Sequence, residues 1–295
     1  MNKMTFKLFM IFVFFLKIIP QFMRDSFFKN LAKLLYLIGK KSNKVIETNL
    51  NFAFKDISKE EITEIQKYSY ANMLSWGQTI IENLDVQDEE FLKNIELENI
   101  EVFHKLKAQN KRIIFISAHY GNMEIMSYYV NKFVTPLVQV ARASKNKEFD
   151  NFLVKSREKS GSKIVFRLGA LKHLVRALKN NKVISLVIDQ NVNPINAINV
   201  KLFSKNVYQS SSTAILARKF DAYIIPAAAI NLGNKKYKIK FYDAIAPIKT
   251  ENEKDDLLQS SQLQANALET IILEDKKQWF WLHKRFKGFY DEIYK

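Results

Sequence analysis

Short apolar runs alternate with helical segments along most of the chain, and this alternation restricts the fold more than any other feature of the sequence. Strands that alternate with helices build a mostly parallel sheet with helices on both faces. We therefore expect an α/β domain with a mixed, mostly parallel sheet flanked by helices. The predicted strands are Arg112–Ser117, Leu137–Ala141, Ile164–Phe166, Val183–Ile188 and Tyr223–Ile230, and the predicted helices are 122–132, 146–159, 169–180, 210–219 and 256–275.

The sheet is expected to be mixed because Lys236–Tyr242 alternates polar and apolar residues, as a half-exposed antiparallel strand does. A further helix is predicted at 56–85, where Ser58 offers an N-cap. The 295 residues show no internal repeat and no linker. We therefore expect one α/β domain at 43–295, preceded by a distinct N-terminal segment at 1–42.

The N-terminal segment is apolar and basic. Its apolar core, Leu8–Leu16, is shorter than the roughly 20 residues that a spanning helix needs, and no small-residue cleavage site follows it. Lys29, Lys33 and Lys40 share one stripe of a helix whose remaining surface is apolar, which is typical of a helix lying on anionic lipid. The alternative is that the apolar face packs on the domain core. Basic residues flank the apolar run on both sides, so we expect the rest of the chain on the cytoplasmic side.

The charge and composition narrow the possible partners. A net charge of +16 favours an anionic partner, such as a phosphorylated substrate, an acidic protein, an anionic membrane or nucleic acid. The chain has no Cys, which excludes disulfides, thiolate catalysis and Cys-bound metals. Only 7 Gly are present, and Gly39-Lys40-Lys41-Ser42 lacks the first Gly and the strand of a phosphate-binding loop. The sequence also has no recognised RNA-binding motif.

Polar side chains follow two of the predicted strands directly. Arg112–Ser117 leads into Ala118-His119, and Val183–Ile188 leads into Asp189-Gln190-Asn191. In open α/β sheets, functional residues gather beyond the carboxyl ends of the strands. These two strand ends are therefore the first places to look for a site.

His119 and Glu124 lie five residues apart, and a continuous helix would place them about 140° apart around its axis. They can face one another only if the helix starts after His119. Gly121 and Asn122 favour that break, with Asn122 as the N-cap. Glu124 then orients the imidazole and stabilises its charged form. An ordinary turn His is the alternative.

A base of this kind would act on an external hydroxyl. The chain offers no Cys nucleophile and no G-x-S-x-G turn. Metal binding is less well supported, because H-x-x-x-x-E is not the H-E-x-x-H pattern of zinc sites, and His104 and His173 lie in Lys-rich helices. We expect direct transfer to a substrate hydroxyl, without a cofactor or a metal.

The stretch SAHYGNMEIM resembles the H-x-x-x-x-D/E motif of glycerolipid acyltransferases, and with its Glu it is similar to the late acyltransferases of lipid A biosynthesis (lauroyl/myristoyl type). Four further blocks resemble that family in order and spacing: SNKVIETNLNFAF, VISLVIDQN, LFSKNVYQSSSTAILAR and QWFWLHKRFKG. Lys44, Lys55 and Ser204 depart from the residues usual in these blocks, as do Phe280 and Lys284. The resemblance covers essentially the whole chain.

The resemblance implies an enzyme on the cytoplasmic face of the inner membrane, with a fold like that of the glycerolipid acyltransferases. It would move an acyl chain from acyl carrier protein to a hydroxyl of an acylated, phosphorylated glucosamine disaccharide (a Kdo-lipid IVA type precursor). His119 would be the general base and Glu124 its orienting partner. Acyl carrier protein is acidic and the acceptor is phosphorylated, so both suit a chain with a charge of +16.

Five further residues are candidates for substrate binding. Arg142 follows a strand and suits an oxyanion or a phosphate, or it is an ordinary surface Arg. Asp189 and Gln190 would bind acceptor hydroxyls or support Arg142, unless they simply form a turn. Arg157 and Gly161 would line the site, or they mark a solvated helix end.

The block around His283 and Arg285 follows Trp279 and Trp281. Aromatic and basic residues together suit a membrane interface with phosphate headgroups, so His283 and Arg285 are also candidates for substrate binding. The same ingredients would serve RNA binding. Two other functions therefore stay open: acyl transfer to another membrane acceptor, such as a lysophospholipid or glycolipid, with acyl-CoA or acyl carrier protein as donor, and a non-catalytic peripheral membrane or RNA-binding protein.

Overall fold

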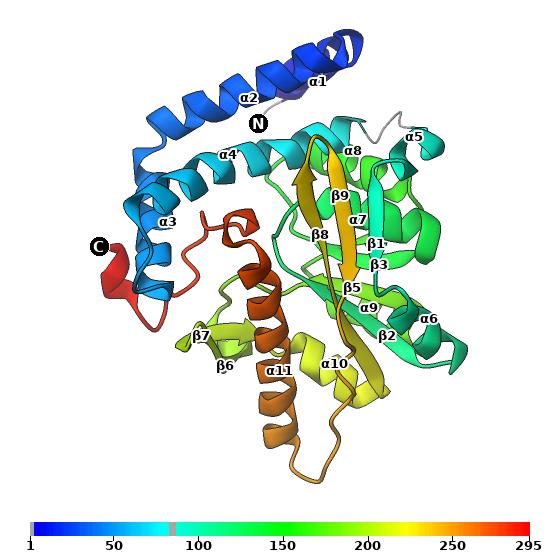
Figure 1. Ribbon diagram of the computed structural model, residues 1–295. Coiled ribbons are helices and arrows are strands. Elements are labelled where there is room, and N and C mark those ends of the chain that lie inside the picture. The colour runs from blue at the N-terminus through cyan, green and yellow to red at the C-terminus, as the bar shows by residue number, and fades with distance from the viewer. Residues whose placement is uncertain (1–2, 83–86) are drawn as a thin grey trace.

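A computed structural model describes residues 3–82 and 87–295 and contains a seven-stranded sheet in the order β1-β9-β8-β2-β5-β3-β4 (Figure 1). Neighbouring strands pair in parallel except β8 and β9, which are antiparallel. The predicted α/β fold with a mixed, mostly parallel sheet is confirmed. The strands are β1 (Ile95–Glu98), β2 (Arg112–Ser117), β3 (Leu137–Ala141), β4 (Lys163–Phe166), β5 (Val183–Val187), β8 (Ala222–Gly233) and β9 (Lys236–Phe241).

Helices cover both faces of the sheet, because the central strands are apolar on both sides. In β2, Ile113 and Phe115 pack with one group of helices and Ile114 and Ile116 with the other, and all four are buried. The first group comprises α5 (Asp88–Leu92), α6 (Glu101–Ala108), α7 (Met123–Tyr129) and the π-helical turn Val130–Val134. The second comprises α3 (Lys40–Ala53), α4 (Lys59–Glu82), α9 (Ala170–Lys179), α10 (Ser212–Phe220) and α11 (Glu253–Glu274). The helix α8 (Lys147–Glu158) joins β3 to β4.

The first two helices stand apart from the main core. They are α1 (Lys3–Ile18) and α2 (Gln21–Ile38), which turn at Pro20 and lie above α4 in Figure 1. They have their own small apolar cluster, in which Val13, Leu16 and Phe28 pack with Ile81 of α4. Most of their large apolar side chains face outward. Among the described helices, none combines the length and the apolar character needed to cross a membrane.

The sequence located six of the strands that the structure describes, including the polar, antiparallel β9, and missed three others. The two strands of the hairpin β6 (Ala197–Leu202) and β7 (Lys205–Ser210) were not predicted, nor was β1, whose sequence IELE carries two Glu. β1 is an edge strand that pairs only with β9, so polar residues are tolerated there. The predicted helix 56–85 is found as α4 up to Glu82, and its last three predicted residues lie outside the described residues.

Candidate active site

The pairing of β2 with β5 brings His119 and Asp189 together. Ser117 of β2 pairs with Val187 of β5, and the backbone N–H of Ile188 donates to the carbonyl of Ser117 at 3.1 Å. Two residues beyond this pair, the segment after β2 reaches His119 and the segment after β5 reaches Asp189. Neighbouring parallel strands thus deliver the imidazole and the carboxylate to the same edge of the sheet.

Asp189 holds His119 by both its ring and its backbone. Nδ1 of His119 lies 2.8 Å from Oδ1 of Asp189, and the backbone N–H of His119 donates to Oδ2 at 2.9 Å. The indole N–H of Trp279 also donates to Oδ2, at 2.8 Å. Asp189 is buried, and both carboxylate oxygens are occupied by donors. The sequence had suggested Glu124 as the orienting partner of the His119 ring, but the ring is hydrogen-bonded to Asp189.

The two groups stabilise each other's charge. Burial would raise the pKa of Asp189, but the His119 charge and the hydrogen bonds from His119 and Trp279 prevail and lower it to about 2. Burial would lower the pKa of His119, but the charge and hydrogen bond of Asp189 raise it above its ordinary value of 6.5. Glu124 adds to this rise through its charge, and Arg157 opposes it. The imidazole is thus a stronger base than an exposed His.

Nδ1 faces Asp189, so Nε2 is the atom available for proton transfer. The side chain of His119 is 21% exposed, and the amide nitrogen of Gln190 lies 3.4 Å from Nε2. Trp76 and Phe280 flank the imidazole, with ring centroids 6.1 Å and 6.0 Å from it. With its proton on Nδ1 and shared with Asp189, the neutral ring presents a lone pair on Nε2 to an incoming hydroxyl.

The predicted break after His119 is confirmed. Gly121 has φ = +51°, and Asn122 caps α7, its side-chain oxygen accepting from the backbone N–H of Glu124 and Ile125 at 3.2 Å each. The amide of Asn122 also donates to Oγ1 of Thr79 on α4 at 2.8 Å. The turn is therefore fixed from both α7 and α4.

Gly121→Ala is predicted to destabilise the protein by roughly 2–4 kcal/mol, because two costs add. A Cβ at this position would lie 1.8 Å from the carbonyl oxygen of Ala229, and φ = +51° is unfavourable for alanine. Gly77→Ala is the matched control. An added methyl group at Gly77, which lies in α4, would meet no neighbouring atom of the described residues within 4 Å, so that change should stabilise the helix slightly. Denaturant unfolding of both variants measures the difference, and equal effects would contradict this account of the turn.

Glu124 is paired with Arg157 rather than with the imidazole. Nε of Arg157 donates to Oε2 of Glu124 at 3.1 Å, and a terminal nitrogen donates to Oε1 at 2.6 Å. Burial would lower the pKa of Arg157, but the charge and hydrogen bonds of the buried Glu124 raise it. The sequence had named both residues without predicting that they pair. This bidentate ion pair fixes a guanidinium close enough to His119 to influence the pKa of its ring.

Arg142 and Gly161 contact neither His119 nor Asp189. Arg142 is exposed just beyond the end of β3, and its side chain has no hydrogen bond or ion pair to another described residue. Gly161 has φ = +98° and lies in the turn between α8 and β4, where the hydroxyls of Ser160 and Ser162 both donate to the carbonyl of Arg157. The turn thus closes the end of the helix that carries Arg157.

The C-terminal block is part of the core, which differs from the membrane-interface interpretation. Trp279 and Trp281 are buried, and Arg285 is 1% exposed, donating to the carbonyl of Tyr208 at 2.6 Å. Burial lowers the pKa of Arg285 to about 10. A side chain so enclosed does not reach an external phosphate. His283 is partly buried, and burial lowers its pKa. It is close enough to Asp189 and His119 for their charges to influence that pKa as well.

Three aromatic residues of the site were not predicted as functional: Trp76, Trp279 and Phe280. Trp279 belongs to a block that the sequence pointed out for another role, and Phe280 donates its backbone N–H to the carbonyl of His119 at 2.9 Å. Trp76 lies on α4, and its indole N–H donates to the carbonyl of Gly121 at 2.7 Å. Their contacts come from segments far apart in the sequence, so no local pattern indicates them.

A His–carboxylate pair at the carboxyl edge of a parallel sheet, with Nε2 open, is the arrangement of an enzyme that activates an external hydroxyl. Among the described residues, no group of three or more His, Asp or Glu side chains is placed to hold a metal ion. The geometry of the His119–Asp189 pair suits general-base chemistry in an α/β enzyme.

The chain belongs to the bacterial lipid A biosynthesis acyltransferases, whose family model matches residues 2–288. It is 24% identical over 262 residues to the lipid A biosynthesis lauroyltransferase of Escherichia coli (strain K12), a match that covers 87% of this chain and 83% of that protein. It is 21% identical over 252 residues to the palmitoleoyltransferase of the same organism, covering 84% and 79%. A lipid A biosynthesis acyltransferase of Haemophilus influenzae is 23% identical over 259 residues, covering 86% and 80%. The family resemblance expected from the sequence is confirmed, and with it acyl transfer in lipid A biosynthesis.

Proposed function

We propose that the protein transfers a fatty acyl chain from the thioester of acyl carrier protein to a hydroxyl of a phosphorylated, acylated glucosamine disaccharide, the lipid A precursor. The observation that carries this proposal is the His119–Asp189 pair, in which the carboxylate holds Nδ1, while Nε2 has only a 3.4 Å contact with the amide of Gln190 among the described residues. Membership of the lipid A biosynthesis acyltransferases supports two parts of the proposal, the transfer of an acyl group and the role in lipid A biosynthesis. The basic charge of the chain suits an acidic donor protein and a phosphorylated acceptor.

His119 acts as the general base. Nε2 takes the proton of the acceptor hydroxyl while the hydroxyl oxygen attacks the thioester carbonyl carbon. The tetrahedral intermediate then collapses, the C–S bond breaks, and the proton on Nε2 passes to the departing sulfur. Asp189 keeps the proton of the neutral ring on Nδ1 and stabilises the imidazolium that forms.

Glu124 belongs to the catalytic pair of the family motif, and its role here is to hold Arg157. The bidentate contact fixes the guanidinium, whose side chain is 22% exposed and so retains a face for substrate. A fixed guanidinium suits the negative oxygen that develops on the thioester carbonyl. Arg142, exposed at the end of β3, suits a phosphate of the acceptor, and Gln190 and His283 lie close enough to the ring to contact the bound substrates.

The N-terminal segment, 1–42, would hold the enzyme on the cytoplasmic face of the inner membrane. The outward side chains of α1 and α2 include Leu8, Phe14, Phe15 and Phe22, which are all at least 60% exposed. Exposed apolar patches of this kind mark sites that interact with a protein or a membrane. Lipid is the proposed partner here, and basic residues of the same helices suit anionic headgroups.

The pH dependence of the rate tests the base. The pKa of His119 is raised, and only the neutral ring accepts a proton, so kcat/KM should fall as the pH decreases through a midpoint above 6.5. A pH profile of kcat/KM with both substrates defined gives this midpoint. The profile of His173→Ala, which changes an exposed histidine of α9, should be the same. A midpoint below 6.5 would contradict the electrostatic description of the pair.

The substrates are tested with the purified full chain in detergent. Acyl-carrier-protein thioester and the phosphorylated disaccharide should give a product whose mass has increased by one acyl chain. Acyl-CoA as the donor and a lysophospholipid as the acceptor should support much slower transfer. Transfer to the lysophospholipid at an equal or greater rate would refute the proposed acceptor, and a preference for acyl-CoA would refute the proposed donor.

A further inference from the structure

The helix α2 presents its apolar side chains outward and its other face to a cavity. Phe22, Met23, Leu34 and Ile38 of α2 are exposed. The opposite stripe of α2 lines a cavity of about 1190 Å³ that is also bounded by α4 and by the turn between β8 and β9. Ligand pockets usually hold roughly 300–1,000 Å³, so this volume accommodates a substantial molecule.

The cavity shares no residue with the His119–Asp189 pair or the Glu124–Arg157 pair. The helix α4 stands between the two places. Its residues Ser75 and Thr79 line the cavity, whereas Trp76 packs against His119. The apolar part of the cavity wall includes Phe28, Ile81, Phe91, Ile95 and Ile125. The cavity is therefore a separate site with an apolar interior.

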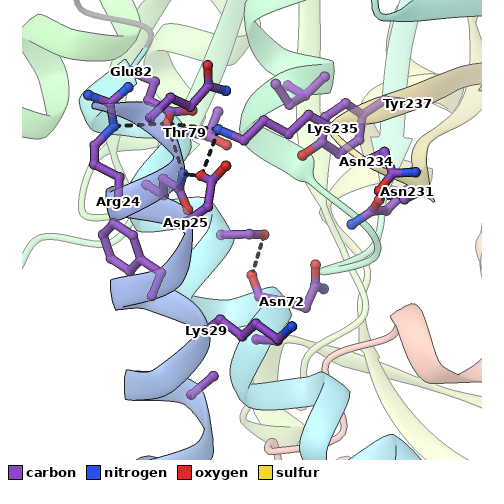
Figure 2. Close-up of a pocket in the computed structure, with 18 of the residues that line it drawn as sticks. Arg24, Asp25, Lys29, Asn72, Thr79, Glu82, Asn231, Asn234, Lys235 and Tyr237 are labelled. Atoms are coloured by element: carbon purple, nitrogen blue, oxygen red, sulfur yellow. Dashed lines mark hydrogen bonds and ion pairs between the residues drawn. The ribbon is translucent and has the colours of Figure 1, made fainter. Parts of the chain in front are cut away.

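At one end of the cavity, four charged side chains neutralise one another. Lys235, in the turn between β8 and β9, lies 2.9 Å from Asp25 of α2 and 3.2 Å from Glu82 of α4. Arg24 of α2 also approaches Glu82, at 3.5 Å. Figure 2 shows these four side chains converging, so that the turn is tied to both helices. This end of the cavity has no net charge to attract a ligand.

The other end of the cavity carries positive charge, and one of its polar groups lacks a hydrogen-bond partner among the described residues. Lys29 and Lys33 line the cavity, are exposed to solvent, and have no carboxylate partner within the described residues. Lys67 of α4 lines it too, with its ammonium over the ring of Tyr36 at 5.7 Å. Asn72 is buried, and its side-chain oxygen accepts no hydrogen bond in the described part of the chain. In Figure 2 Lys29 and Asn72 are drawn away from the neutral cluster. The one carboxylate of the wall outside that cluster is Glu90, on α5.

We propose that this cavity binds an anionic glycerophospholipid of the membrane. The phosphate binds to Lys29, Lys33 and Lys67, as an ammonium group binds phosphate. A hydroxyl of the headgroup, such as those of phosphatidylglycerol, donates to the free oxygen of Asn72, which needs a donor. One acyl chain enters the apolar interior beside Phe28 and Phe91. The lysines reach solvent beside the outward apolar face of α2, which places the entrance where a lipid bilayer would touch that face.

Native mass spectrometry of the full chain in detergent tests the proposal, with phosphatidylglycerol as the probe and phosphatidylcholine as the neutral comparison. One phosphatidylglycerol should bind per chain, and phosphatidylcholine should bind about tenfold or more weakly. The double variant Lys29→Glu/Lys33→Glu should lose phosphatidylglycerol to a similar degree. Lys172→Glu, which reverses an exposed charge on α9, is the matched control and should keep it.

A second variant keeps the test valid if the double variant fails to fold. Ala71→Trp adds an indole to the cavity wall from an exposed position of α4, and it should abolish phosphatidylglycerol binding while the chain stays folded. Equal binding of the two lipids, or full binding by a folded variant of either kind, would refute the proposal. Displacement of bound phosphatidylglycerol, mole for mole, by the phosphorylated disaccharide would refute it as well, because the cavity would then be part of the acceptor site.

Discussion

Replacing His119 with alanine will lower the rate of acyl transfer by roughly 10²–10⁴-fold, the usual contribution of a positioned general base. The change removes Nε2, the ring nitrogen that is not held by Asp189. The fold should survive, because Asp189 keeps the hydrogen bonds from Trp279 and from the backbone N–H of residue 119. Single-turnover rates with acyl-carrier-protein thioester measure the first effect, and thermal unfolding measures the second.

The control for this variant is His173→Ala. His173 is exposed on α9 and contacts none of the groups of the site, so its removal should leave both the rate and the unfolding temperature unchanged. A folded His119→Ala variant that retains transfer within a few-fold of the parent protein would remove the base from the mechanism. A loss of transfer accompanied by unfolding would instead assign His119 a structural role.

Asp189→Asn will lower the rate by roughly 10³–10⁴-fold, as the equivalent change does in Ser-His-Asp enzymes. Asparagine is almost the same size as aspartate and can still accept the hydrogen bonds of Trp279 and the His119 backbone through its oxygen. Its NH₂ group then faces Nδ1, which must act as an acceptor. The ring proton moves to Nε2, and the base loses the lone pair that the reaction needs.

Two further variants distinguish the orientation of the His119 ring by Asp189 from a general loss of stability and from an effect of Glu124. Asp256→Asn changes a second buried aspartate, one that accepts hydrogen bonds from Arg218 and Thr250, and it should affect stability but not the rate of the folded enzyme. Glu124→Gln breaks the bidentate pair with Arg157 and tests the family motif directly. Full activity in Asp189→Asn, together with loss of activity in Glu124→Gln, would show that Glu124 alone orients the base.

Residue patterns predicted most of the sheet because the central strands are buried on both faces. The residues Ile113–Ile116 are buried on both faces of β2, so all of them are apolar. They form a continuous apolar run of the length expected for a strand. β1 and the β6–β7 hairpin lie at edges or outside the main sheet, where polar residues are compatible with a strand. Pattern alone cannot distinguish such strands from loops.

The candidate site was predictable in part. The turn at Gly121 and Asn122 follows from local chemistry, and it is found as expected. The partner of His119 follows instead from strand order: β5 lies beside β2, although β3 and β4 separate them in the sequence. Spacing along the chain therefore predicted Glu124, five residues away, as the partner of His119. The order of the strands instead places Asp189, which is 70 residues away, beside the imidazole. Trp279 is more distant still, and no periodicity could have assigned it.

The contact between Trp279 and Asp189 has a consequence for biosynthesis of the protein. Trp279 leaves the ribosome after every strand of the sheet, as do Trp281 and His283, to whose carbonyls Asn49 of α3 donates at 2.8 Å each. The helices α1 and α2 are made long before, so under the proposed anchoring they would reach a membrane while Asp189 still lacks one of its donors. Asp189 gains all of its hydrogen bonds only after the segment that carries Trp279 has been made.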